Sequence, residues 1–397
     1  MFREDFLLLN QEIIYLDNGA TSLKPKIIGE EISNYYNNYS ANAHRGDYDL
    51  SLKVDSKYEE TRMLVKEFIN ASKAKEIIFT SGTTDALNKL IFGYFKYNLK
   101  PHDEVLITKS EHASNVLPWF ELADNLNLKI NYIPLDNDLS LTLENVKKSI
   151  TKNTKVISIA HITNVVGDIR PIKEIILYAH QHQILVIIDG AQSVAHIPVD
   201  VTALDIDFLT FSAHKMLGPT GVGILYGKEE LLKKIHPIIF GGGMNASFDN
   251  DGSRIYDDLP QLLEAGTPNI AGVIGFSAAI KYLNNIKMVN IKKYEESLKL
   301  YTIKKLKEID NLIIYNEHSK SGIITFNYKD IFAQDLAIYL NKYNICIRAG
   351  NHCAKILKDE LGIKNTCRIS LYFYNTKQEI DKLVEVLKNP YIKDEII

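Results

Sequence analysis

The chain lacks several features that would assign it to common protein classes. Only 3 of its 397 residues are cysteine, an odd number that does not suit a disulfide framework. No apolar run approaches the roughly 20 residues of a membrane-spanning helix, and residues 1–5 are too acidic for a signal peptide. The formal net charge of −3 gives no electrostatic reason to expect nucleic acid as a partner. We therefore expect a soluble cytoplasmic protein with neither membrane nor nucleic acid as a partner.

Short β-rich runs alternate with helical stretches between about residues 60 and 230. Apolar strands separated by helices predict a mostly parallel sheet that helices cover on both faces. The stretch Ile172–His182 is amphipathic and long enough for a crossover helix. The predicted strands are Ile77–Thr80, Glu104–Thr108, Ile130–Pro134, Val156–Ala160, Leu185–Asp189, Phe208–Phe211 and Val222–Tyr226.

Polar clusters follow five of these strands. In open α/β sheets, ligands bind beyond the carboxyl ends of the strands, so the clusters predict a common binding site. They are Ser81-Gly82-Thr83-Thr84, Ser110-Glu111-His112, His161 to Asn164, Asp189 to Gln192 and Ser212 to Lys215.

The C-terminal part predicts a second, smaller α+β unit after an irregular segment that runs from Gly241 to Pro268. Its helical regions are expected at Ala271–Ile309, Gln334–Tyr343 and Lys377–Lys388, and its strands at Ile323–Phe326, Cys346–Arg348 and Cys367–Leu371. A length of 397 residues suits two units of this kind. We expect an N-terminal segment (1–20) that joins the small domain, a large domain (21–268) and a small domain (269–397).

Lys215 and Asp189 could supply the two poles of a pyridoxal phosphate site. A lysine amine can form the Schiff base that tethers an aldehyde cofactor. An aspartate carboxylate can pair with the protonated ring nitrogen and keep the ring an electron sink. Asp189 could instead be an N-cap, because Asp-Gly commonly marks a turn.

Gly82-Thr83-Thr84 has the character of an anion site at the start of a helix. Alone, the motif favours a plain N-cap, which Ser and Thr often provide. Ser212 and His214 lie just before the candidate lysine in sequence. Taken together with Gly82-Thr83-Thr84, they make a phosphate site the better interpretation.

Two further polar residues fit a cofactor ring. His112 could lie flat on the ring and transfer protons, although a lone histidine is more often a hydrogen-bonded structural residue. Gln192 could donate to the phenolic oxygen of the cofactor, or it could reflect the polarity of a helix start.

Arg368 and Cys353 are candidates for substrate chemistry. An arginine on a strand suits bidentate capture of a carboxylate, and a salt bridge to an acidic helix is an equal alternative. Cys353 follows a turn, beside glycine, histidine and Arg348, in a setting that favours a nucleophilic thiolate. We interpret Cys346 and Cys367 as small buried hydrophobes. No metal site is expected, because His352-Cys353 lacks a second ligand pair at zinc spacing.

These motifs together resemble the class V, fold-type I aminotransferase superfamily, and within it the group II cysteine desulfurase/selenocysteine lyase branch. The similarity spans essentially the whole chain, and the run Arg-Ala-Gly-x-His-Cys-Ala is specific to this branch. It implies a PLP-dependent transferase fold, with a mostly parallel seven-stranded sheet in the large domain and a smaller α+β domain that carries the cysteine. The matching segments are Tyr15 to Ser22, Asn42 to Gly46, Gly82 to Thr84, His112 to Asn115, Asp189 to Gln192, His214 to Gly221, Glu264 to Asn269, Arg348 to Ala354 and Thr366 to Arg368.

The resemblance implies a role for each matching residue. Lys215 would hold pyridoxal 5'-phosphate and transfer protons, Asp189 would pair with the ring nitrogen, and Gln192 would reach the ring oxygen. His112 would stack on the ring. The phosphate would be bound by Thr83, Thr84, Ser212 and His214, with Thr267 reaching across from a second subunit. The substrate would be bound by Arg368 and Asn164, with His44, Arg45 and Arg348 at the pocket mouth.

The implied activity is removal of sulfur from L-cysteine, which yields L-alanine and a persulfide on Cys353. The sulfur would pass to an acceptor protein for iron–sulfur cluster assembly, and the enzyme would be a homodimer. The alternatives are a selenocysteine lyase acting on L-selenocysteine, another class V enzyme that uses no thiol, and a non-catalytic scaffold.

The chain departs from the family pattern at two positions near the cysteine. Asn351 replaces a usual histidine and Ile356 replaces a usual proline. The region Met244–Arg254 is also atypical, which predicts an altered surface for the sulfur acceptor.

Overall fold

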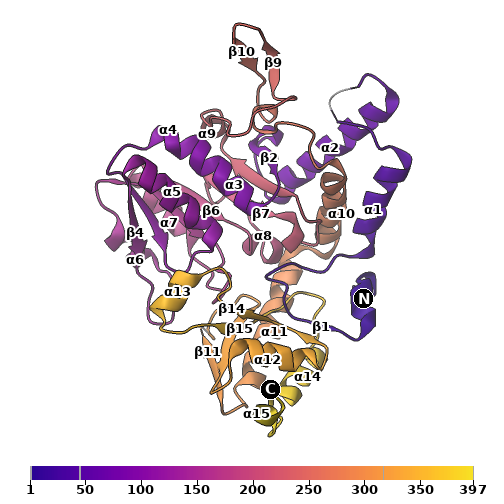
Figure 1. Ribbon diagram of the computed structural model, residues 1–397, viewed down its shortest axis with the longest axis vertical. Coiled ribbons are helices and arrows are strands. Elements are labelled where there is room, and N and C mark those ends of the chain that lie inside the picture. Colours follow the sequence, from indigo (N-terminus) through magenta and orange to yellow (C-terminus); the bar gives the residue numbers. More distant parts are fainter. Residues whose placement is uncertain (1, 44–45, 316, 397) are drawn as a thin grey trace.

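A computed structural model describes residues 2–43, 46–315 and 317–396. It contains a seven-stranded sheet flanked by helices and, at the end of the molecule that holds the C-terminus, a four-stranded sheet (Figure 1). Among the described residues, no helix is long and apolar enough to cross a membrane.

The large sheet has the strand order β2-β8-β7-β6-β5-β3-β4. Its pairs are parallel from β4 to β7, whereas β8 runs antiparallel to both β7 and β2. This arrangement confirms the predicted fold class, and each strand lies within two residues of its predicted position. The bounds are β2 Ile77–Thr80, β3 Glu104–Thr108, β4 Lys129–Ile133, β5 Thr154–Ala160, β6 Leu185–Asp189, β7 Phe208–Ser212 and β8 Gly223–Gly227.

Two apolar cores cover the two faces of this sheet. In β6, Val186 and Ile188 belong to one core and Ile187 to the other, because successive strand side chains point to opposite faces. The predicted crossover helix is α7 (Ile172–Gln181), which buries Ile172, Ile175, Ile176 and Ala179 at helical spacing. The other helices near the site are α3 (Thr83–Leu90) and α5 (Leu117–Leu126).

The small sheet is antiparallel and has the order β11-β12-β15-β14. The strands are β11 Leu312–Tyr315, β12 Ile323–Tyr328, β14 Arg348–Gly350 and β15 Thr366–Ser370. Helices α11 (Met288–Leu306), α12 (Ala333–Asn341) and α14 (Lys377–Leu387) contribute to the same core.

The predicted strand Cys346–Arg348 is divided between two sheets. Ile345–Cys346 (β13) pairs in parallel with Ile14–Tyr15 (β1), whereas β14 pairs with β15. The N-terminal segment therefore contacts the small unit directly, which supports our proposed segment 1–20.

Helix α10 (Ile270–Ile286) packs against α1 (Lys26–Asn38) and α2 (Asp49–Phe68) of the large unit. The backbone turns between α10 and α11 at Lys287, where φ is +73°. We propose that the domain boundary lies near Lys287 rather than at residue 269.

Candidate active site

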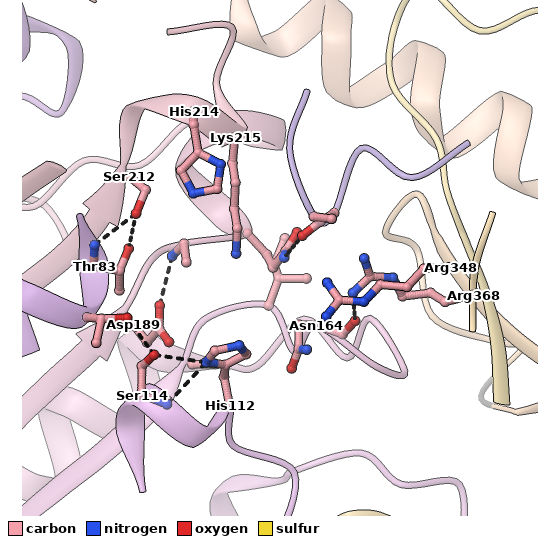
Figure 2. A pocket seen from close by; sticks show the side chains of 17 residues that line it. Thr83, His112, Ser114, Asn164, Asp189, Ser212, His214, Lys215, Arg348 and Arg368 are labelled. Carbon is pink, nitrogen blue, oxygen red and sulfur yellow. Dashed lines mark hydrogen bonds between the residues drawn. The ribbon is translucent and has the colours of Figure 1, made fainter. Parts of the chain in front are cut away.

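A cavity of about 220 Å³ lies beyond the carboxyl ends of β5, β6 and β7. The predicted clusters at the ends of these strands converge on it, and segments from the N-terminus and the small sheet complete its wall. Figure 2 shows Lys215 between the Thr83–Ser212 pair on one side and Arg348 and Arg368 on the other. The predicted site residues that line the cavity are Thr83, Thr84, His112, Asn164, Asp189, Gln192, Ser212, His214, Lys215, Arg348 and Arg368.

Asp189 and Lys215 experience the same low-dielectric surroundings. Burial raises the pKa of Asp189 to about 6, against the hydrogen bond that its Oδ1 accepts from Ala191 N at 2.9 Å. Burial lowers the pKa of Lys215 to about 8, although the Asp189 charge acts in the opposite direction. A lysine with a lowered pKa is a better nucleophile near neutral pH.

Hydroxyl groups gather at the start of α3. Ser212 Oγ accepts a hydrogen bond from Thr83 N at 2.8 Å and lies 2.7 Å from Thr83 Oγ1, while Thr84 Oγ1 lies 2.7 Å from Ser114 Oγ. The two strand ends come very close here, since a Cβ on Gly223 would lie 2.4 Å from the Cα of Gly82. The hydroxyls and the positive end of the helix dipole suit an anion.

His112 is held in one orientation. Its Nδ1 accepts from Ser114 N at 3.1 Å and lies 3.1 Å from Ser114 Oγ (Figure 2). Burial lowers the pKa of His112 to about 4, so the ring is neutral near pH 7 with its proton on Nε2. A neutral, fixed imidazole suits stacking on a cofactor ring. Sequence reasoning assigned no role to Ser114, although it belongs to the matching segment His112 to Asn115.

Arg368 is buried and makes contacts from two sides. Its Nη1 donates to Asn164 O and its Nη2 to Asp17 Oδ1, each at 2.9 Å, while its Nε has no hydrogen-bond partner in the described part of the chain. Arg368 thus forms a salt bridge and also lines the cavity, and its capture of a substrate carboxylate stays a prediction. The carboxylate partner comes from the N-terminal segment rather than from a helix, and sequence reasoning missed Asp17.

The cavity offers complementary groups for pyridoxal phosphate. Asp189 is a buried carboxylate that has no cationic hydrogen-bond partner among the described residues, which suits a protonated ring nitrogen. The hydroxyl cluster at α3 suits the phosphate, and Lys215 lies between the two. Two buried acceptors in the cavity wall, Gln192 Oε1 and Asn164 Oδ1, lack partners among the described residues. Gln192 Nε2 already donates to Gly19 O at 2.8 Å, and its second hydrogen is the one left for a ring oxygen.

Cys353 lies beside the cavity without lining it. Its side chain is exposed, and Sγ is 3.9 Å from Nη2 of Arg348, which does line the cavity. His352 and Cys353 adopt left-handed backbone conformations, with φ of +52° and +56°. Such residues each cost about 1–3 kcal/mol and persist only where surrounding contacts outweigh that cost.

Contacts from the large unit fix this turn. Asn164 Nδ2 donates to His352 O at 2.7 Å, and Ala113 N donates to Cys353 O at 2.8 Å. The other cysteines differ from Cys353: Cys346 is partly buried and Cys367 is buried.

Of the three remaining predicted residues, one lies in the described part of the chain. Thr267 is exposed and lies outside the lining, while His44 and Arg45 fall outside the described residues. No group of three or more His, Cys, Asp or Glu side chains in the described ranges could hold a metal ion.

Comparison with known proteins identifies the family. The aminotransferase class-V family model matches residues 14–383. Probable cysteine desulfurases from Halalkalibacterium halodurans and Staphylococcus aureus are 42% and 41% identical, covering 96% and 97% of this chain and 95% of each relative. The structure is similar to that of the cysteine desulfurase CsdA from Escherichia coli, in an S-sulfonic acid form (TM-score 0.93, 34% identity, covering 100% of this chain and 98% of that one). It is also similar to the apo cysteine desulfurase from Thermococcus onnurineus (TM-score 0.95, 37% identity, 99% and 98% covered). The chain therefore belongs to the class-V aminotransferases and, among them, to the cysteine desulfurase family that its sequence motifs predict.

Proposed function

We propose that this chain is a pyridoxal-phosphate-dependent cysteine desulfurase that removes sulfur from L-cysteine and releases L-alanine. The observation that carries the proposal is the position of Cys353. An exposed thiol lies 3.9 Å from Arg348, beside a cavity that contains a lysine, a buried aspartate and a buried arginine.

The chain's own residues would hold the cofactor at three points. Lys215 Nζ would form the covalent link, Asp189 would face the ring nitrogen, and Thr83, Thr84, Ser212 and His214 would hold the phosphate. When bound, pyridoxal phosphate withdraws electrons from the substrate Cα through its ring. Family membership and the fit of these groups support the assignment.

Arg368 and Lys215 would act on the amino-acid part of the substrate. The Arg368 guanidinium would bind the substrate carboxylate through its other N–H groups, because its bonds to Asn164 and Asp17 are the two that it makes with described residues and use only part of its donor set. Lys215 Nζ would take the Cα proton, a task that its lowered pKa of about 8 supports. His112, with Nδ1 fixed, would hold or release a proton at Nε2.

Cys353 would act on the sulfur. Its thiolate attacks the substrate sulfur, so an S–S bond forms while the C–S bond breaks and its electron pair stays with the substrate carbon. That carbon takes up a proton and becomes the methyl group of alanine. Overall, the Cys353 thiol and L-cysteine become the Cys353 persulfide and L-alanine, and no external oxidant is consumed.

We further propose that the enzyme is a cytoplasmic homodimer that passes its sulfur to an acceptor protein of iron–sulfur cluster assembly. The hairpin of β9 (Asn245–Phe248) and β10 (Arg254–Tyr256) projects from the body of the chain (Figure 1). Its Phe248 and Ile255 are 73% and 64% exposed. An isolated hairpin with exposed apolar side chains has little stability in water, which supports its burial against a second copy. Thr267 is likewise exposed and free to reach a neighbouring subunit.

The test is incubation of the cofactor-loaded protein with L-cysteine and a reductant. Sulfide and alanine should appear in equal amounts, and without reductant a persulfide should map to Cys353. Cys353→Ala should lose alanine formation from L-cysteine but keep the visible absorbance of the bound cofactor. Undiminished turnover of L-cysteine by this variant would contradict the proposed role of the thiol. Activity restricted to L-selenocysteine would identify a selenocysteine lyase instead.

A further inference from the structure

A buried hydrogen-bond cluster lies directly behind the turn that carries Cys353. Its members are His352 in the turn, Lys358 in α13 (Lys355–Glu360) and Thr366 in β15, and all three are at most 2% exposed. Lys358 Nζ donates to Thr366 Oγ1. His352 Nε2 lies 2.9 Å from the same oxygen and 3.0 Å from the Thr366 carbonyl oxygen. Thr366 therefore joins the helix to the turn.

The chemistry of the three groups sets the direction of these bonds. A lysine ammonium can only donate. Burial, helped by the charges of Arg368 and Lys358, lowers the pKa of His352 to about 2, so its ring is neutral. Since both Thr366 oxygens face Nε2, the ring proton is assigned to that nitrogen. Thr366 Oγ1 thus accepts from Lys358 and from His352 at once.

Stability alone does not account for Lys358. Burial lowers its pKa to about 8, and no carboxylate of the described residues forms an ion pair with it. A buried ammonium without a counter-ion opposes folding, and an apolar side chain of similar size would serve the core better. A residue that is unfavourable for folding and lies five positions after the nucleophile points to a role at the nucleophile.

That role concerns the left-handed turn. Asn164 and Ala113 hold the carbonyl groups of His352 and Cys353 from the large unit, whereas Thr366 holds the His352 ring from the small sheet. We propose that Thr366 and Lys358 are positioning residues for the Cys353 thiol. They fix the His352 ring, and with it the turn, so that Sγ stays beside Arg348. The significance for catalysis rests on the proposed function of Cys353.

The test measures the rate at which iodoacetamide alkylates Cys353 in the cofactor-loaded enzyme without L-cysteine, with the site mapped by peptide mass. Thr366→Val should slow alkylation at pH 7 by about fivefold or more, because Sγ is no longer held beside the Arg348 guanidinium. Thr366→Ser, which keeps the hydroxyl, should stay within about twofold of the parent. Lys358→Met should slow alkylation of Cys353 as much as Thr366→Val does, and it should not lower the free energy of unfolding.

Two controls separate positioning from simple loss of charge or stability. Lys355 is exposed and pairs with Asp359, and Lys355→Met removes the same charge two residues from Cys353. It should change the alkylation rate by less than about twofold. Arg348→Gln should slow alkylation in the parent but have little further effect in Thr366→Val, since coupled residues give non-additive effects.

The proposal is wrong if Thr366→Val and Lys358→Met are both alkylated at the rate of the parent. It is also wrong if Arg348→Gln slows alkylation by the same factor in Thr366→Val as in the parent. These results do not depend on turnover. If Cys353 were not the sulfur carrier, alanine formation would persist in Cys353→Ala while the alkylation pattern stayed the same.

Discussion

The backbone N–H of Ala113 donates to the carbonyl oxygen of Cys353 at 2.8 Å. This bond joins the loop that follows β3 to the turn that follows β14. The proposed proton-transferring histidine, His112, precedes Ala113 directly. The spacing between the ring-stacking group and the proposed nucleophile is therefore set by main-chain contact as well as by side chains.

Asp189→Asn should change the stability of the cofactor-free protein in a pH-dependent way. A carboxyl whose pKa is raised to about 6 on folding supports the folded state only while protonated. The contribution of the Asp189 carboxyl to stability is full below about pH 4, the pKa of the carboxyl in the unfolded chain. It is lost as the pH rises through about 6. Because asparagine cannot ionise, the free energy of unfolding of the variant should exceed that of the parent by roughly 2–3 kcal/mol at pH 8 and by little at pH 4. Urea denaturation at both pH values measures this, and an equal effect at both would contradict the assignment.

Arg368→Lys should weaken substrate binding far more than cofactor binding. Lysine retains a charge but cannot reproduce the planar donor geometry that contacts Asn164 and Asp17. We expect KM for L-cysteine to rise by about 10- to 100-fold, corresponding to charge-assisted bonds worth about 1.5–3 kcal/mol. The absorbance of the bound cofactor should be unchanged. An unchanged KM would show that another group binds the carboxylate.

Gly223→Ala should damage the anion site through the backbone. The added Cβ would meet Gly82 Cα at 2.4 Å, so either β8 or the start of α3 must move. We expect a loss of about 1–3 kcal/mol in the free energy of unfolding, together with weaker binding of pyridoxal phosphate. Gly29→Ala is the matched control, because nothing lies within 4 Å of its Cβ position in α1. It should stabilise the chain by about 0.5–1 kcal/mol.

Phe248→Asp should convert the proposed dimer to a monomer. The charge would be placed on a side chain that is 73% exposed in the single chain and that we expect to be buried by the partner. Sedimentation should then give the mass of one 45.1 kDa chain. Tyr391→Asp is the control. Tyr391 is 65% exposed and precedes α15 (Ile392–Glu395), at the other end of the molecule from the hairpin (Figure 1). If both variants remain dimers, the hairpin is not the interface.

Much of the large sheet and its ligand edge could be predicted from sequence. The strands are mostly apolar because both faces of the sheet are buried, and five of them end where the predicted polar clusters begin, as at Asp189 in β6. Periodicity could not predict the division of Cys346–Arg348 between two sheets, because that depends on which strands lie opposite.

The residues missed at the site are those whose roles arise only from contacts. Asp17 meets Arg368 across a large separation in sequence, and Lys358 meets Thr366 inside the small unit. Asp17 lies in the matching segment Tyr15 to Ser22 but was given no role there, and Lys358 lies in none of the matching segments. Their roles come from the partners that the fold places beside them.

The Asp17–Arg368 pair joins residues 351 positions apart, one near each end of the chain. During synthesis, all seven strands of the large sheet are made before Arg368, which we propose binds the substrate carboxylate. A prematurely terminated chain could therefore retain much of the cofactor pocket and still be unable to orient an amino acid. We therefore expect turnover only once the small unit, which carries Arg368 and Cys353, has folded against the large one.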